Sequence, residues 1–123
     1  MQQTVFSWLR SYPSLASLEQ ESLSGTPGSA GLFTGGSTLL RRRSDITGRE
    51  TRRRRLRFTL QRHCTGDSGP QWLEDFSRWA EATAPALGED PVFSCGKGQL
   101  IRADAEGISR YSIELTFEFT QEV

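Results

Sequence analysis

The stretch RRLRFTLQR, residues 54–62, decides the fold, because polar and apolar side chains alternate along its length. The apolar set is Leu56, Phe58 and Leu60, and the polar set is Arg55, Arg57, Thr59 and Gln61. A period of two is typical of a β-strand that buries one face. The stretch therefore predicts a strand with an apolar core face and a cationic outer face.

A second alternating stretch, residues 110–120, carries the opposite charge. Its inward set is Ile113, Leu115, Phe117 and Phe119, and its outward set is Glu114, Thr116 and Glu118. Opposite charges on facing strands contribute roughly 0.2–1 kcal/mol per pair. We therefore expect the two strands to be neighbours, within one subunit or across two.

A long β-hairpin is expected immediately before the first strand. Residues 41–55, RRRSDITGRETRRRR, place two arginine clusters on either side of a turn at Thr47-Gly48. Residues 31–40 are expected to form the strand that enters it. Residues 22–37 are rich in Gly, Ser, Thr and Pro, and such composition favours a mobile loop. The whole segment 22–55 is thus predicted as a mobile loop and a basic hairpin.

Two amphipathic helices are predicted from apolar residues at helical spacing. The first covers residues 4–12, and Pro13 ends it. The second covers residues 70–82, with Asp67 or Ser68 as its cap. Residues 92–103 are expected to form one more strand, with a turn at 96–98. The predicted core consists of Trp8, Leu9, Leu56, Phe58, Leu60, Trp72, Phe76, Trp79, Ile113, Leu115, Phe117 and Phe119.

The order of elements, α-β-β-α-β-β, predicts one α+β domain over residues 1–123. We expect a mainly antiparallel four-stranded sheet, two helices packed on one face, and the long hairpin as an extension. No apolar run approaches the ~20 residues of a membrane-spanning helix. The first residues lack the basic region of a signal peptide. A product assembled in the cytoplasm, with no membrane partner, is expected.

Motifs for enzymatic or metal chemistry are weak. Gly66-Asp67-Ser68-Gly69-Pro70 resembles a serine-protease nucleophile segment, but His63 is only five residues from Ser68 and the chain cannot hold two barrels. Gly96-Lys97-Gly98 lacks the remaining residues of a phosphate-binding loop. Asp104 and Glu106 fit a solvated turn. The sequence predicts no enzyme and no cofactor.

The cysteines do not alter that conclusion. Cys64 and Cys95 stand 31 residues apart without a CxxC motif, and His63 is the single histidine of the chain. A zinc site needs three or four ligands at suitable spacing. We expect no metal site and two reduced, half-buried cysteines.

Charge is distributed unevenly along a chain whose net charge is zero. Ten arginines lie between residues 41 and 62 with two acids among them, whereas eleven acids and four cations lie beyond residue 66. The arginines fit a contact with a neighbouring subunit, a contact with nucleic acid, or a solvated surface. The candidate contact residues are Arg41, Arg42, Arg43, Arg53, Arg55, Arg57, Glu114 and Glu118.

Taken together, these blocks resemble the small phage tail-terminator proteins, also labelled minor capsid proteins, of long non-contractile tails. The resemblance rests on Trp8-Leu9 before a Pro-Ser-Leu stop, the hairpin and RRLRFTLQR, the helix PQWLEDFSRWAEA (70–82) and the end RADAEGISRYSIELTFEFTQE (102–122). The helix and the terminal block are the most specific parts. The arginine density and the Gly-rich 25–36 segment depart from the family pattern, in the region expected to make ring contacts.

The resemblance implies a structural virion protein. Such proteins form a six-fold ring on the head-proximal end of the tail tube, stop polymerisation of the tube protein, and offer a docking face to a head-completion or connector protein. DNA passes through the lumen, and there is no active site. A head-to-tail ring needs two complementary faces, which the basic hairpin and an acidic strand would supply. The alternative is a small nucleic-acid-binding module that uses the arginine-rich hairpin.

Overall fold

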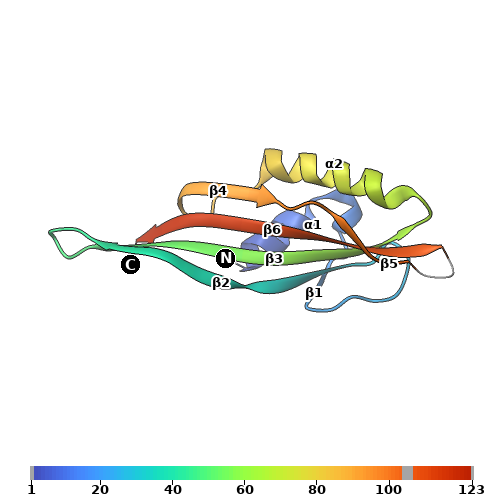
Figure 1. Cartoon of the computed structure of the whole chain (residues 1–123), viewed down its shortest axis with the longest axis horizontal. Helices are drawn as coiled ribbons and strands as arrows, with labels where there is room; N and C mark the ends of the chain where they lie inside the picture. The colour runs from blue at the N-terminus through green and yellow to red at the C-terminus, as the bar shows by residue number, and fades with distance from the viewer. Residues whose placement is uncertain (1, 104–106, 123) are drawn as a thin grey trace.

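The computed structural model describes residues 2–103 and 107–122 and contains two α-helices, one 3-10 helix and six strands (Figure 1). The helical elements are α1 (Gln2–Arg10), η1 (Pro13–Leu15) and α2 (Ser68–Thr83). The strands are β1 (Glu19–Gln20), β2 (Ala30–Ser44), β3 (Glu50–Thr65), β4 (Glu89–Cys95), β5 (Gln99–Ala103) and β6 (Ile108–Glu122).

The strands form one sheet in the order β1-β2-β3-β6-β4, and β5 pairs with β6 beyond the end of β4. The predicted α+β class is confirmed and every strand pairing but one is antiparallel, but the sheet has six strands instead of the predicted four. The sheet is mixed, because the short β1 runs parallel to β2. The single strand expected over 92–103 is also wrong: β4 and β5 pair with different parts of β6. The Gly96-Lys97-Gly98 segment separates them, and Gly98 lies so close to Leu73 of α2 that a side chain there would collide.

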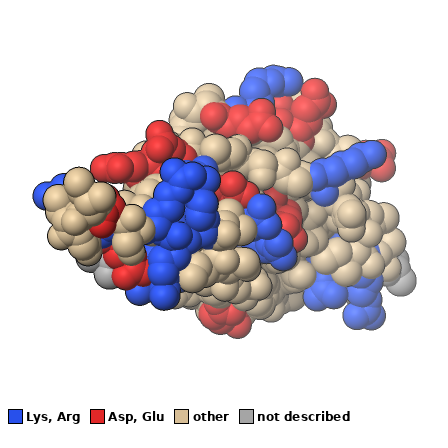
Figure 2. Space-filling view, turned by 60° about the vertical axis from the view of Figure 1, so that its left-hand side comes forward, with Lys and Arg blue, Asp and Glu red and all other residues tan. Residues whose placement is uncertain are grey.

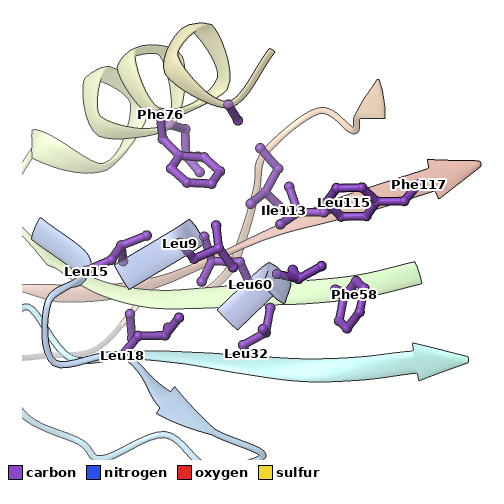
Figure 3. Close-up of a cluster of buried hydrophobic side chains, with 14 of the residues drawn as sticks. Leu9, Leu15, Leu18, Leu32, Phe58, Leu60, Phe76, Ile113, Leu115 and Phe117 are labelled. Carbon is purple, nitrogen blue, oxygen red and sulfur yellow. The ribbon is translucent and has the colours of Figure 1, made fainter. Parts of the chain in front are cut away.

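The two alternating stretches lie side by side as expected. β3 and β6 are antiparallel over their whole length, with Leu56 opposite Phe117, Phe58 opposite Leu115 and Leu60 opposite Ile113. These side chains point to the face that α1 and α2 cover (Figure 3). The opposite face of the sheet carries the polar alternates of the same strands.

A continuous hydrophobic cluster joins both helices to that sheet face. Eight of the twelve predicted core residues are fully buried, and Trp8, Leu56, Trp72 and Trp79 are partly buried and pack against them. Trp8 of α1 stacks on Trp79 of α2 with ring centroids 5.1 Å apart. Leu15, Leu18, Ala30 and Leu32 join the core from segments that have no helical or alternating pattern.

The start of α2 differs from the expected one. The helix begins at Ser68, and Asp67 occupies the cap position without a side-chain hydrogen bond. The Ser68 hydroxyl instead donates to the carbonyl of Thr65 at 2.6 Å. The predicted capping bond, in which a side-chain oxygen of Asp67 or Ser68 accepts from a helix N–H, is therefore wrong. The Ser68 side chain acts as a donor to the preceding turn instead.

Residues 22–29, expected to belong to a mobile loop, are irregular but hydrogen-bonded. Ser24 donates its backbone N–H to Glu19 at 2.8 Å, and the backbone of residues 28 and 29 exchanges two bonds with His63 of β3. From Ala30 onward the chain is already strand, and its first three residues are buried. The mobility of residues 22–29 in solution stays a prediction.

Candidate interaction surface

The β2–β3 hairpin extends beyond the core at one end of the molecule (Figure 1). We call residues 36–57 the basic arm. Every residue of β2 from Thr34 to Ser44 is exposed, whereas the β3 half is supported by β6 as far as Thr51 opposite Glu122. The arm is thus a three-stranded ribbon for most of its length, and only its tip is two-stranded.

The tip of the basic arm is closed by Asp45. Its Oδ1 accepts bonds from the Thr47 backbone N–H at 2.9 Å, the Thr47 hydroxyl at 2.6 Å and the Arg49 backbone N–H at 3.0 Å. The Thr47 hydroxyl bond is the main reason that the pKa of Asp45 lies below its usual value. Gly48 adopts φ 86°, which favours glycine. The predicted turn at Thr47-Gly48 is confirmed.

Strand register divides the arginines of the arm between two faces. Arg41 lies opposite Arg53 and Arg43 opposite Thr51, whereas Arg42 lies opposite Arg52. Side chains directly opposite each other share a face. The face of the sheet away from the helices, which we call the outer face, therefore receives Arg41, Arg43, Arg53, Arg55 and Arg57.

Of the eight predicted contact residues, Arg42 alone lies on the helix side of the sheet. There its Nε is 2.7 Å from Glu50, which also receives Arg52 at 3.1 Å. The other seven share the outer face, because Glu114 and Glu118 are even-numbered residues of β6 and their odd-numbered neighbours face the core.

Glu118 binds two of the outer-face arginines. Arg55 reaches it at 2.7 Å and Arg53 at 3.9 Å. The Arg53 guanidinium also donates to the carbonyl of Asp90 at 2.8 Å and to the hydroxyl of Thr120 at 3.1 Å. These partners are in the same chain. Arg53 and Arg55 are therefore neutralised within their own chain.

Three outer-face arginines of the basic arm have no acidic partner among residues 2–103 and 107–122: Arg41, Arg43 and Arg57. Glu114, further along β6, is exposed and also makes no ion pair within this described part. Figure 2 shows Lys and Arg side chains gathered near the arm end of the molecule, with acidic side chains beside them. The arm thus presents uncompensated positive charge on one side of a ribbon.

The opposite edge of the sheet is acidic. Glu89 and Asp90 are exposed at the start of β4, and α2 beside it exposes Glu74, Asp75 and Glu81. Arg78 is the one cation on the described residues of α2, and it pairs with Glu74 at 3.3 Å. The edge strand β2 and the edge strand β4 therefore carry opposite charge.

Both edges are open to further strand pairing. β1 covers β2 only at Gly31 and Leu32, so the β2 edge from residue 36 to residue 44 has no strand partner among the described residues. β4 ends the strand order on the other side. Unpaired edge groups are a template for pairing with another chain. Near the β2 edge, Leu39 and Leu40 are 44% and 39% exposed.

The structure gives no support to the chemical motifs. His63 lies within β3 and Ser68 begins α2, with no hydrogen bond between the two side chains. Within the described ranges no group of three or more His, Cys, Asp or Glu residues could hold a metal ion. Both cysteines are free, Cys64 buried and Cys95 partly so. Asp104 and Glu106 lie outside the described residues.

Membrane insertion by a helix finds no support either, since neither described helix combines the length and the apolar character needed to cross a bilayer. Among known proteins, neither a family model nor a curated sequence matches this chain.

Sequence reasoning missed one group of outer-face residues. His63, Arg102 and Arg110 come from three strands and lie side by side, because His63 is opposite Arg110 and Arg102 is opposite Arg110 on its other side. No motif marks them. Their proximity depends on register and on a bulge at residue 101, and neither can be deduced from composition.

Proposed function

We propose that this protein is a structural ring subunit that caps a phage tail tube, ends its polymerisation and forms the head-tail joining surface. The observation that carries the proposal is the pair of open sheet edges with opposite charge, described above. The tail tube protein and a head-completion or connector protein would bind the two sides of the ring, and DNA would pass through its lumen. In this role the protein is not an enzyme and resides in the virion.

The ring contact in this proposal is the β2 edge of one subunit against the β4 edge of the next. Two different edges make a head-to-tail contact. Repeated head-to-tail contacts form a closed ring when the rotation from one subunit to the next is a whole fraction of a full turn. The basic arm would lie over the acidic residues of the neighbour's β4 and α2. Strand addition supplies backbone hydrogen bonds, and the charges select the correct edge.

Because some arginines of the arm are already paired within their own chain, the proposed contact between subunits depends on the others. Arg53 and Arg55 are held by Glu118 of their own chain, whereas Arg41, Arg43 and Arg57 share the same face without an acidic partner in the described part. Reversal of the second set leaves the internal pairs intact. It is therefore the sharper test of subunit contact.

Size-exclusion chromatography with light scattering tests the contact. We expect wild-type protein near six times 13.8 kDa, and the triple variant R41E/R43E/R57E as a folded monomer. Arg10→Glu, an exposed arginine of α1 outside the proposed contact, is the charge-reversal control and should leave the ring intact. A triple variant that elutes as the wild type would exclude the arm as the ring contact.

The second candidate function is nucleic-acid binding by the same arginines. The observation in its favour is that Arg41, Arg43 and Arg57 line one face of an exposed ribbon without an acidic partner in the described part, and clustered arginines bind the phosphate backbone of DNA. A monomer whose DNA affinity falls steeply with salt, and falls further in R41E/R43E/R57E, would favour this function.

A further inference from the structure

A small pocket on the outer face, distant in the sheet register from the basic arm, is lined by three basic side chains. His63, Arg102 and Arg110 form its walls together with Ile108. They belong to β3, β5 and β6, and the pocket has a volume of about 190 Å³. It is therefore a preformed hollow built on strands.

Register holds the three side chains close together. Arg110 of β6 has His63 directly opposite on β3 and Arg102 directly opposite on β5. Directly opposed side chains have Cβ atoms ~4.5–5.5 Å apart, and like charges in such positions repel. The sheet thus sets two guanidinium groups and an imidazole against one another.

The described residues provide nothing to offset this repulsion. No ion pair or side-chain hydrogen bond joins His63, Arg102 or Arg110 to another residue within 2–103 and 107–122. The Arg110 Nε is fully buried and has no hydrogen-bond partner. A buried donor without a partner costs free energy unless a ligand accepts its bond. The site therefore has one unsatisfied buried donor, Arg110 Nε, as well as clustered basic groups.

We propose that this pocket binds a phosphate group. The tetrahedral anion presents several acceptor oxygens, which suit guanidinium donors arranged around one point. Arg110 would be the central ligand, with Arg102 and His63 on either side. The phosphate is either a backbone phosphodiester of a nucleic acid or a free phosphate. The site does not depend on the ring, because all three side chains belong to one subunit.

The test is a titration of the full-length protein with inorganic phosphate, against chloride at constant ionic strength, followed by ¹⁵N NMR. We expect shifts of the backbone resonances of His63, Arg102 and Arg110. Arg110→Gln should weaken phosphate binding by about tenfold, the effect of losing one charge-assisted hydrogen bond. Arg57→Gln, an exposed outer-face arginine outside the pocket, should bind phosphate as the wild type does.

A second variant guards against a folding failure of Arg110→Gln. Arg102 is exposed on an edge strand, so Arg102→Gln should fold normally and also weaken phosphate binding. Equal phosphate affinity in the wild type and both variants, or no shift at the three positions, would overturn the proposal.

A duplex oligonucleotide identifies the source of the phosphate once binding is established. If Arg110→Gln lowers DNA affinity and reduces the slope of log K against log salt by about one, the ligand is a backbone phosphate. If Arg110→Gln weakens inorganic phosphate alone, the ligand is a free phosphate. Either result supports the pocket.

Discussion

Arg55 and Glu118 face each other across β3 and β6, with Arg55 Nη2 2.7 Å and Nε 2.8 Å from the same carboxylate oxygen. The pair joins the basic arm to β6, which supports the arm along most of its length. It also removes the charge of one arginine from the surface available to partners. The arm is thus anchored by one set of arginines and is open to contact through another.

The anchoring role predicts a measurable coupling between the two residues. Their side chains are 31% and 25% exposed, so solvent screening keeps the coupling free energy near 1 kcal/mol. A double-mutant cycle of Arg55→Gln and Glu118→Gln, followed by urea unfolding, measures it. The exposed Arg78–Glu74 pair serves as control, with ~0.3–0.5 kcal/mol expected. Equal coupling in both pairs would contradict the anchoring role.

Among the substitutions considered, we expect truncation of Phe76 to cause the largest loss of stability. Its ring is fully buried and stacks on Trp72 with centroids 5.1 Å apart. Phe76→Ala should lower the free energy of unfolding by about 3–5 kcal/mol, because it removes apolar contacts and leaves a cavity. Urea denaturation gives the value, with the exposed Glu81→Ala as control. A loss below about 1 kcal/mol would mean that α2 does not pack on the sheet as described.

Gly31 of β2 leaves no room for a side chain. A Cβ at this buried position would collide with the backbone carbonyl of Ser22. Gly31→Ala should therefore destabilise the protein by about 1–3 kcal/mol. Gly25→Ala is the matched control, since the space around Gly25 is open. Thermal unfolding of the two variants compares them, and equal midpoints would show that residue 22 does not lie over β2.

We expect the stability of the turn at the arm tip to depend on the ionisation of Asp45. Its folded pKa lies below the ordinary value of 3.8, chiefly because the Thr47 hydroxyl binds the carboxylate. The turn is therefore stabilised above pH 3.8, and that stability is lost as the pH falls through the lower folded pKa. An NMR titration measures the pKa, and Thr47→Val should raise it towards 3.8. No change in this variant would contradict the turn geometry.

The alternating stretches predicted β3, β6 and their pairing because both faces of those strands have a fixed environment. Leu56, Phe58 and Leu60 face a core, and Arg55 and Arg57 face solvent, so the period of two is visible without the structure. Arg62 breaks that pattern on the core face, where it lies 4.7 Å from the ring of Trp72. A cation over an aromatic ring makes such an exception stable.

Other features depend on contacts that no local pattern records. β1 has only two residues and exists because the chain returns beside Gly31. The split between β4 and β5 falls at residues 96–98, where Gly98 closely approaches Leu73 of α2. Bulges between Thr34 and Gly36 and between Leu39 and Arg41 shift the register of β2 and set Arg41 opposite Arg53. Arg55 is paired because Glu118 lies opposite it on β6, whereas Arg57 lies opposite Thr116.

Electron microscopy of phage tails assembled without this protein tests the central claim most directly. If the protein caps the tail tube, its absence leaves polymerisation without a stop, and tails of greatly increased and variable length should accumulate without heads. Restored wild-type protein should return the tails to a single length, and R41E/R43E/R57E should not. Tails of normal length that join heads normally in the absence of the protein would contradict the account.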